Sequence, residues 1–413
     1  MSLLCRLLQN RDRLIDLAVK YCYPTFKLFF WLAIKVIKIK YKDIKIGCLY
    51  YQRIGHLSLN TDLFLRRQQL GIVDQETLFI FLVFRGRNNT NNYVANEHLL
   101  KMFKRKLHIV DGCLIPRLIR DYTINTPMWY GLLPFDSNEV FEYQNAKPCV
   151  SFTKQEEEQG KALLESVGIG TNDWFVCIMN KDDAYYNRFY SGVDCDHHAF
   201  RYTDIDTFVK ASELIIQSGG WVFRMGNATA KKIAFSHPRF IEFTESKIFS
   251  AFMDIYLFAT AKFVLADNLG GISPAFLFDN HCAIVNMHPP CCLHATKNTI
   301  HIPMKIFSDE SKTFLSAEEA CSKIQWPDSL FAQEYEKRGL RVVPNSEEEI
   351  YDLTREMLER LCGKFEYNQD DLKQQEHYHK ITSKLGYSKE SRSPIGRDFL
   401  RNNHWFLGYK HDE

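Results

Sequence analysis

The sequence predicts an α/β protein with two domains, each built around a parallel β-sheet. Short apolar runs of about four to eight residues alternate with helical patterns, as expected for parallel strands buried on both faces. The chain has 413 residues, and single hydrophobic cores stop growing at roughly 250–300 residues. Strand–helix alternation over this length therefore favours two α/β halves.

The predicted strands and the clearest helix follow from hydrophobic periodicity. The strands are Ile44–Tyr51, Thr77–Phe84, Lys106–Val110, Trp174–Met179, Trp221–Met225, Phe240–Phe243, Phe263–Ala266 and Ala283–Asn286. The helix is Thr203–Ser218, with Thr203 or Asp204 as its N-cap and Gly219-Gly220 as its stop.

The domain boundaries are placed where these patterns change. Residues 1–43 form a basic amphipathic arm, 44–165 the first domain and 166–330 the second. Residues 331–413 lose the strand pattern, and we expect a helical extension that packs on both domains. Ligands of parallel α/β sheets bind beyond the carboxyl ends of the strands, which is where we expect the functional residues.

The N-terminal arm is the basic part of an otherwise slightly acidic chain. Residues 1–48 contain ten Lys or Arg and three Asp, whereas the net charge of the whole chain is +2. The apolar stretch Phe26–Ile37 is too short, and too interrupted by lysine, to cross a membrane. Two interpretations remain open: an interfacial anchor on an anionic membrane, or a helix docked on the body with a solvated lysine face.

Composition excludes several other classes of protein. The small net charge and the lack of a domain-wide basic face argue against nucleic-acid binding. Twelve cysteines are too few for a disulfide scaffold, and Cys177 and Cys282 lie inside apolar runs. No secretory signal is recognisable, so we expect a reducing, cytoplasmic location.

A loop after the first predicted strand carries the candidate catalytic base. In Arg53-Ile54-Gly55-His56, Gly55 permits a tight turn and His56 would lie at the carboxyl edge of the sheet. Imidazole has an unperturbed pKa suited to proton abstraction near neutrality. The alternative is a histidine that caps a helix start and is satisfied by the backbone. Arg53, Gly55 and Asn60 are assigned to the acceptor side of this site.

Three loops in the second half could bind a phosphate group. Arg224 ends an apolar strand close to Gly226, and its guanidinium could hold a diphosphate, although pairing with a buried carboxylate is the alternative. Lys181 could contact phosphate, and Asp182 could orient a hydroxyl or a base; a solvated loop is the alternative. A strand, a glycine-rich turn and a helix start form a third candidate anion site. That segment contains Asp267, Asn268, Gly270, Gly271, Ile272 and Ser273.

No metal or cofactor is expected. Cys195-x-His197-His198 and the set His288…Cys291-Cys292-x-His294 contain ligand types, but neither has zinc-site spacing. The sequence contains no GxSxG, Walker A or GxGxxG motif, which counts against hydrolase, P-loop and dinucleotide-binding functions.

Taken together, these segments resemble heptosyltransferase-like glycosyltransferases of the GT-B type, and more closely a family of bacterial glycosyltransferases known chiefly from sequence. The Arg53–His56 loop resembles the family's opening loop, and Lys181-Asp182-x-x-Tyr185 resembles its R-D-x-x-Y element with Lys in place of Arg. Residues 201–226 are the most similar stretch, and Asp267–Pro274 resembles the donor-phosphate segment. The segment Asp267-Asn268-Leu269-Gly270 departs from the D-T-G of heptosyltransferases.

The resemblance implies a GT-B fold, in which two Rossmann-like domains face a central cleft. It also implies a nucleotide-sugar donor in the second half and a glycan, lipid-linked or protein acceptor in the first. His56 occupies the position of the acidic base of heptosyltransferases. The expected function is metal-independent glycosyl transfer in bacterial surface-polysaccharide or glycoconjugate biosynthesis, at the inner face of the membrane if the arm binds there. A nucleotide-sugar epimerase and a non-catalytic sugar-binding protein remain the alternatives.

Overall fold

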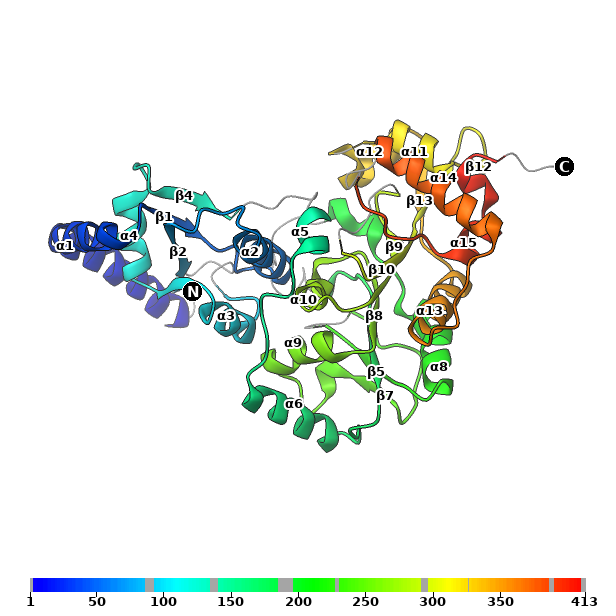
Figure 1. Cartoon of the computed structure of the whole chain (residues 1–413), viewed down its shortest axis with the longest axis horizontal. Helices are drawn as coiled ribbons and strands as arrows, with labels where there is room; N and C mark the ends of the chain where they lie inside the picture. Colours follow the sequence, from blue (N-terminus) through cyan, green and yellow to red (C-terminus); the bar gives the residue numbers. More distant parts are fainter. Residues whose placement is uncertain are drawn as a thin grey trace. The chain divides into compact units, whose positions relative to one another are not determined.

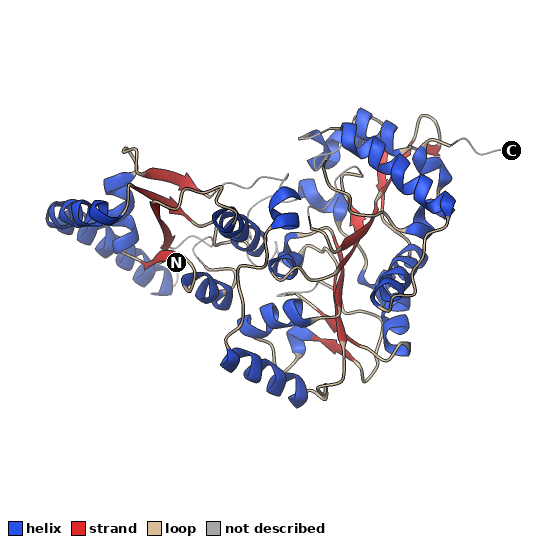
Figure 2. Cartoon of the chain, in the orientation of Figure 1, coloured by secondary structure: helices blue, strands red, loops and turns tan. Residues whose placement is uncertain are grey.

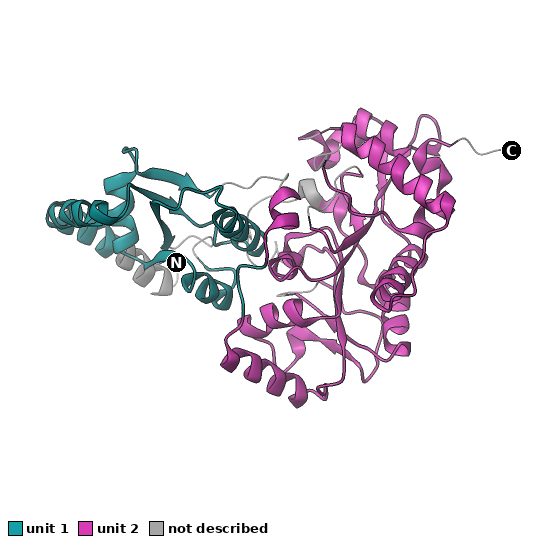
Figure 3. Ribbon diagram, viewed as in Figure 1, with its two compact units in different colours: residues 1–136, 148–151 teal, residues 137–147, 152–413 magenta. Residues whose placement is uncertain are grey.

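The computed structural model describes residues 3–85, 93–133, 140–184, 196–226, 230–290, 296–325, 327–385 and 390–409, with side chains from residue 13 onward except 196–198 and 385. The chain divides into two compact units (Figure 3). Unit 1 comprises residues 1–136 and 148–151, and unit 2 comprises residues 137–147 and 152–413. Each unit is built around its own parallel sheet.

Unit 1 begins with a long helix and continues as strand–helix repeats (Figure 1). Its elements are α1 (Leu3–Lys40), β1 (Asp43–Cys48), α2 (Ile54–Gln69), β2 (Thr77–Phe84), α3 (Glu97–Lys104), β3 (His108–Gly112), α4 (Ile115–Thr123) and β4 (Trp129–Leu132).

The four strands of unit 1 are parallel, in the order β3-β2-β1-β4. The chain moves outward from β1 through β2 to β3 and then returns to place β4 on the other side of β1. This return creates a switch point between β1 and β4. One sheet face packs against α1 and α4 around Ile34, Ile46, Leu82 and Ile119, whereas Phe64 of α2 packs against Phe79 and Phe81 on the other face.

Unit 2 has a larger sheet with helices on both faces (Figure 2). Its strands are β5 (Phe175–Met179), β6 (Trp221–Arg224), β7 (Phe240–Glu242), β8 (Phe263–Asp267), β9 (Cys282–Met287), β10 (Thr299–Pro303), β11 (Lys305–Ser308), β12 (Thr313–Phe314) and β13 (Leu340–Val343). Its α-helices are α5 (Val140–Asn145), α6 (Lys154–Ser166), α8 (Val209–Gln217), α9 (Ala251–Thr260), α10 (Ser273–Leu277), α11 (Ala317–Lys323), α12 (Ala332–Glu336), α13 (Glu347–Leu361), α14 (Gln369–Leu385) and α15 (Arg397–Asn402).

Short 3-10 helices complete unit 2. They are η1 (Asp196–Arg201), η2 (Ile205–Phe208), η3 (Phe243–Glu245), η4 (Gly270–Ile272), η5 (Asp328–Leu330) and η6 (His404–Leu407).

The six-stranded parallel sheet of unit 2 has the order β10-β9-β8-β5-β6-β7. Numbered from its first strand, this is 3-2-1-4-5-6, the order of doubly wound sheets whose ligands bind at the reversal point. The reversal lies between β5 and β8. On one face, α8 and α13 pack on the strands through Phe208, Ile215, Ile350, Leu353 and Met357. A separate antiparallel sheet has the order β12-β11-β13.

The C-terminal segment completes unit 2. Ile395 forms a parallel bridge with His301 of β10, flanked by a hydrogen bond from the Gly396 N–H to the His301 carbonyl at 2.8 Å. Phe399, Leu400 and Phe406 belong to the same core as the buried strands.

All eight strands predicted from the sequence are present, and most of their ends lie within two residues of the predicted positions. The half-exposed β4 and the strands β10 to β13 were not predicted. Strand β4 contains Gly131 at a φ of 86°, and β10 contains a buried histidine and ends in proline, so neither has the continuous apolar pattern of a core strand.

Two organisational predictions differ from the structure. The domain boundary expected near residue 165 lies at 136–152 instead, because α6 belongs to unit 2. Gly160 of α6 lies so close to Tyr256 of α9 that a Cβ atom would come within 2.2 Å of the ring, and the Phe152 ring contacts the rings of Tyr256 and Phe278. Residues 331–413 also contain the strand β13, so this region is not purely helical. The core contacts described for residues 331–413 lie in unit 2. That this region also packs on the first domain stays a prediction.

The N-terminal arm is one helix, and it packs on unit 1. Within the described residues, no helix combines the length and hydropathy that a membrane span requires.

The cysteines correspond only partly to expectation. Cys177 and Cys282 are buried and free, and burial raises the pKa of both thiols. Cys321, in contrast, is disulfide-bonded, which is not expected for a chain in a reducing compartment.

Candidate functional site

Asp267, the last residue of β8, organises the reversal point of unit 2. Its side chain is 2% exposed. Oδ2 accepts hydrogen bonds from the Lys181 backbone N–H at 2.7 Å and from the Thr203 hydroxyl. Oδ1 accepts one from Asn286 Nδ2 at 2.7 Å. One carboxylate thus connects three segments: the chain after β5, the segment before η2 and strand β9.

The position of Asn286 is itself fixed by a second asparagine. Its φ of 52° lies in the left-handed region, which asparagine tolerates better than most residues. The backbone N–H of each of Asn286 and Asn345 donates to the side-chain oxygen of the other at 2.6 Å. This reciprocal pair holds the Asn286 amide against Asp267.

Positively charged groups gather around Asp267. Burial, followed by the positive charge of Arg201, lowers the pKa of Lys181 to about 7. In the described part of the chain, no acceptor lies within hydrogen-bond distance of the Lys181 ammonium. The Arg201 guanidinium donates to the carbonyl of Asn268 at 2.8 Å, which holds it beside the turn after β8. Two cations that repel one another at the carboxyl edge of a sheet would both be stabilised by a bound anion.

The pKa values of the buried acid and histidine beside these cations are shifted toward the neutral forms. Burial raises the pKa of Asp267 to about 6, opposed by its hydrogen bonds. Burial, with the charges of Arg201 and Lys181, lowers the pKa of His288 to about 3. His288 Nε2 lies 2.8 Å from the Tyr335 hydroxyl, while its buried Nδ1 has no partner among the described residues. Strongly perturbed pKa values gathered at one strand edge are typical of functional sites.

Arg224, at the end of β6, was predicted either to bind a diphosphate or to pair with a buried carboxylate, and the structure bears on both roles. Its side chain is 1% exposed, and Nη1 forms an ion pair with Glu242 of β7 at 3.0 Å. This is the carboxylate pairing proposed as the alternative. Its Nε and Nη2 are nevertheless buried without a hydrogen-bond partner in the described structure. Unsatisfied buried donors cost about 1–3 kcal/mol each, so an anion that accepted from them would be favoured. Gly226, at a φ of 148°, provides the turn expected of it.

The glycine-rich turn is followed by a short helix, as predicted, and anion binding there stays a prediction. Gly270, Gly271 and Ile272 form the 3-10 turn η4, and the helix α10 after it has only five residues, from Ser273. The aligned peptides that create a helix dipole are therefore few. Gly271 packs closely against Met179, since a Cβ atom there would lie 2.6 Å from the terminal methyl group of that flexible side chain. Ile272 and Ser273 are buried, and Asn268 donates to the His288 carbonyl at 3.1 Å.

Asp182 joins two loops through hydrogen bonds to its carboxylate. Its carboxylate accepts from the backbone N–H groups of Ala184 at 3.1 Å and Ala230 at 3.0 Å. It thereby connects the loop after β5 to the segment after β6. Tyr185, the last residue of the motif noted in the sequence, lies outside the described residues.

His56 lies in the first turn of α2, beyond the end of β1. Asn60 donates from Nδ2 to the Leu133 carbonyl at 2.8 Å, which directs its Oδ1 toward His56 Nδ1 at 3.3 Å. An acceptor at Nδ1 favours the tautomer with hydrogen on Nδ1 and the basic lone pair on Nε2. Burial lowers the pKa of His56, and Tyr50 stacks on its ring at 4.2 Å. A neutral imidazole with a basic Nε2 is the form that a general base needs.

The other residues of this loop have roles that differ in part from prediction. Arg53 is the N-cap residue of α2 without a side-chain capping bond, and its charge contributes to the lowered pKa of His56. Gly55 was expected in a tight turn, but it lies inside the helix and has no positive φ. Asn60 positions His56 and joins α2 to the end of β4.

Sequence reasoning missed several members of the unit 2 site. Arg201 and Asn286 were not singled out, His288 was considered only as a possible metal ligand, and Thr203 only as an N-cap. In the structure Asp204 caps η2, while Thr203 binds Asp267. The one usable signal was position: Asn286 and His288 surround the end of β9, the strand next to β8.

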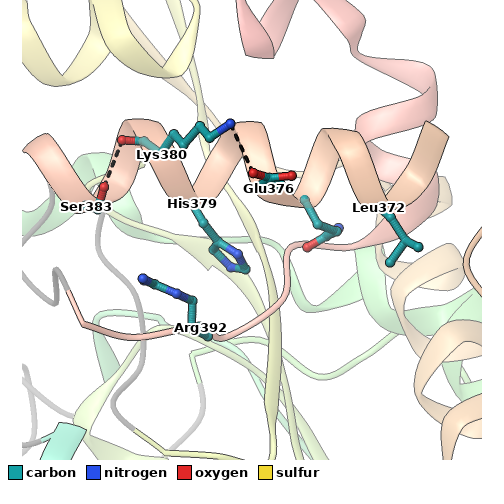
Figure 4. A pocket seen from close by; sticks show the side chains of 7 residues that line it. Leu372, Glu376, His379, Lys380, Ser383 and Arg392 are labelled. Carbon is teal, nitrogen blue, oxygen red and sulfur yellow. Dashed lines mark hydrogen bonds and ion pairs between the residues drawn. The ribbon is translucent and has the colours of Figure 1, made fainter. Parts of the chain in front are cut away.

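Two other features bear on where a ligand binds. Among the described residues, no group of three or more His, Cys, Asp or Glu is placed to hold a metal ion. Of the Cys and His clusters noted in the sequence, His288 is the one member whose side chain is described. A hollow of about 420 Å³ on α14 contains none of the predicted site residues (Figure 4). Lys380 there pairs with Glu376 at 3.0 Å, so this part of the hollow carries little net charge.

Comparisons with known proteins give distant structural neighbours only. No family model matches the chain, and no curated protein matches it. A family 9 glycosyl transferase from Veillonella parvula DSM 2008 is similar at a TM-score of 0.42 and 9% identity, over 64% of this chain and 87% of that one. The E. coli ADP-heptose lps heptosyltransferase II is similar at a TM-score of 0.38 and 10% identity, over 62% of this chain and 90% of that one. At such scores the likeness assigns no family, and the fold is defined by the two parallel sheets themselves.

Proposed function

We propose that the protein is a glycosyltransferase that takes its sugar from a nucleotide-sugar donor and transfers it to a hydroxyl group of an acceptor. The observation that carries the proposal is the arrangement at the reversal point of unit 2. There, Lys181 and Arg201 lie near one another beside a buried Asp267. Two cations at the carboxyl edge of a doubly wound sheet suit the diphosphate of an activated sugar. The motif resemblance of residues 53–56 and 181–182 favours the same class of donor.

In this proposal the donor binds unit 2 through its phosphates. Lys181 and Arg201 neutralise the charge that develops on the departing diphosphate as the bond to the sugar breaks. The Nε and Nη2 groups of Arg224 are two further donors for a phosphate oxygen, and the N–H groups of residues 270–273 line the same strand end. Asp267 holds the chain around the phosphates and contributes no step of its own.

Unit 1 supplies the acceptor side. His56 Nε2 removes the proton from the attacking hydroxyl, while Asn60 holds Nδ1 and so fixes the ring and its tautomer. Burial lowers the pKa of this histidine, and the charge of Arg53 acts in the same direction. We place the reaction in glycoconjugate or polysaccharide assembly, with glycan, lipid-linked or protein acceptors, and propose that it needs no metal.

Ligand-dependent thermal stability tests the proposal. UDP, GDP, CMP and ADP sugars are compared on the full chain and on Lys181→Met. A donor present at about 100 times its dissociation constant stabilises the folded protein by roughly 2.7 kcal/mol, and the variant should lose most of this effect. Lys161→Met, an exposed lysine of α6, serves as the control.

Turnover then separates the alternatives. Conversion of the donor to an epimer without an acceptor would make the protein an epimerase. Binding without any turnover, unchanged in His56→Ala, would make it a sugar-binding protein. If no nucleotide sugar stabilises the protein, the proposed donor site is wrong.

A further inference from the structure

The helix α1 is docked on unit 1 by one side. Phe26, Phe30 and Ile37 pack against a core that includes Ile34, and the Phe30 ring lies edge-on to Tyr122 at 5.1 Å. Arg117 of α4 pairs with Asp16 at 3.2 Å, and the Tyr23 hydroxyl donates to the Asp121 carbonyl at 3.3 Å. The helix is therefore held in a fixed rotation about its own axis.

The opposite side of α1 is apolar and exposed. Successive helical residues are about 100° apart, which places one row of side chains directly away from the packed side. That row, here called the outer stripe, consists of Leu14, Leu17, Tyr21, Leu28, Leu32 and Ile39, which are between 45% and 85% exposed. Phe29, Trp31 and Val36 lie on its borders and are exposed as well. Lys35 falls in the same row. Exposed apolar surface of this length nevertheless indicates an interaction site rather than a solvent-facing helix.

Basic side chains follow one flank of the same helix. Arg13, Lys20, Lys27 and Lys38 fall between the packed side and the outer stripe, and all four are exposed. Lys35 lies over the Trp31 ring at 3.8 Å. Between residues 13 and 40 the sequence has one acidic residue, Asp16, and Arg117 already pairs with it. The flank is therefore strongly positive.

A groove lies beside the C-terminal end of the helix. Tyr41, the residue after α1, lines it together with Ile80, Val110 and the polar residues Lys104 and His108, and its volume is about 500 Å³. Ile80 and Val110 also contact the core beneath α1. The groove therefore lies on the same sheet face as α1, beside the end that carries Ile39.

We propose that α1 lies in the surface of an anionic lipid bilayer, with its outer stripe among the acyl chains and its lysine flank at the phosphates. An apolar row beside a lysine row is the pattern of interfacial helices, which bury about 5–10 Å into the boundary. Tyr21 and Trp31 have the ring types that favour this depth. The helix is thus sandwiched between the sheet of unit 1 and the membrane.

A second copy of the chain fits this surface less well. A helix–helix seam would need apolar side chains in a heptad pattern, through positions 14, 17, 21, 24, 28, 31 and 35. Pro24 and Lys35 interrupt that seam. The flanking cations would also face their own copies, without acidic partners, whereas lipid phosphates neutralise them.

Vesicle binding by the full chain tests the proposal. Co-sedimentation with phosphatidylcholine vesicles is compared with and without phosphatidylglycerol, and we expect binding only when the anionic lipid is present. Leu17→Ser/Leu28→Ser/Ile39→Ser should abolish it, whereas the control Ile115→Ser/Ile124→Ser, which changes exposed apolar residues of α4 and its C-terminal end, should not. Lys20→Gln and Lys27→Gln should each reduce partitioning by about fivefold, and added salt should act in the same direction.

Two measurements make the outcome decisive. Thermal unfolding shows whether each variant is folded, as expected because the outer stripe is not part of the core. Quenching of tryptophan fluorescence by brominated lipid should be largely lost in Trp31→Phe. Equal binding to neutral and anionic vesicles, or binding retained by the triple variant, overturns the proposal. So does a dimer in solution that the triple variant abolishes. The inference depends on unit 1 alone, so its failure leaves the proposed reaction untouched.

Discussion

The backbone N–H of Lys181 lies 2.7 Å from Oδ2 of Asp267, so a single hydrogen bond joins the chain after β5 to the last residue of β8. These strands are neighbours in the sheet but are separated by two other strands along the chain. The bond therefore spans the reversal point. It also places the Lys181 side chain beside Arg201, and several of the predictions below follow from this arrangement.

The charge of Lys181 should make donor binding depend on pH. Because its pKa is lowered to about 7, the ammonium is mostly protonated below this pH and loses its proton above it. Affinity for a nucleoside diphosphate should then fall as pH rises through about 7, by up to tenfold per pH unit. Isothermal calorimetry between pH 6 and pH 8.5 measures it. Lys181→Arg, which stays charged, should bind with little pH dependence, and an equal slope in both proteins would contradict the assignment.

Removal of the Asp267 carboxylate should destabilise unit 2. Asp267→Ala leaves the Lys181 N–H, the Thr203 hydroxyl and the Asn286 amide without their acceptor, at a cost of about 3 kcal/mol. Thr203→Val, which removes one of these donors, should cost less. Urea unfolding measures both values. Equal stability of Asp267→Ala and wild type would show that the carboxylate does not hold the strand ends together.

The same carboxylate should affect the pH dependence of stability. Its folded pKa of about 6 lies above the ordinary 3.8, so the folded state binds more protons between these values than the unfolded state. The contribution of Asp267 to the free energy of unfolding therefore decreases as pH rises from about 4 to about 6. Unfolding curves across this window should show that slope in wild type and a smaller one in Asp267→Ala.

Two substitutions distinguish the role of Arg224 in nucleotide binding from its ion pair with Glu242. Glu242→Gln removes the ion pair but keeps the guanidinium, so nucleotide binding should survive with reduced stability. Arg224→Ala should weaken binding by about 1.5–3 kcal/mol for a lost charged hydrogen bond. Calorimetry on the folded proteins at low temperature gives both affinities. If both variants bind the nucleotide as wild type does, Arg224 is purely structural.

His56→Ala should affect turnover and not donor affinity. Turnover should decrease by about 10²–10⁴, the usual contribution of a general base. The ascending limb of the pH–rate profile in wild type should lie below the ordinary histidine value of 6.5, since burial lowers the pKa of His56, and the variant should lack it. His281→Ala, another half-buried histidine with a lowered pKa, is the control. Near-normal turnover in His56→Ala would show that His56 is not the base and would leave Asp182 as the next candidate.

Catalysis should continue after chelation. The proposed leaving-group stabilisation relies on Lys181, Arg201 and Arg224, none of which needs a metal. Initial rates with and without EDTA should therefore agree. Loss of activity that Mn²⁺ or Mg²⁺ restores would require a metal in the mechanism.

The sequence could predict eight of the ten strands of the two parallel sheets because each of these eight is a local apolar run, which β4 and β10 are not. It could also predict that Asp267, Lys181 and Arg224 lie at strand ends. The partners of these residues could not be predicted, since Thr203 and Asn286 reach Asp267 only through the order of strands in the sheet. Glu242, the partner of Arg224, is 18 residues away, and no local pattern marks the pair. The short apolar helix predicted after the glycine-rich turn is present as α10, Ser273–Leu277.

The bridge between Ile395 and His301 sets an order of events during synthesis. Unit 1 has its whole sheet within residues 43–132, so it can fold once these have left the ribosome. The core of unit 2 contains Phe399 and Phe406, so it remains incomplete until almost all of the chain has been made. At roughly 5–20 residues per second, the interval is on the order of tens of seconds. Throughout that interval α1 already presents its outer stripe, and unit 1 can reach a lipid surface before unit 2 can hold a nucleotide.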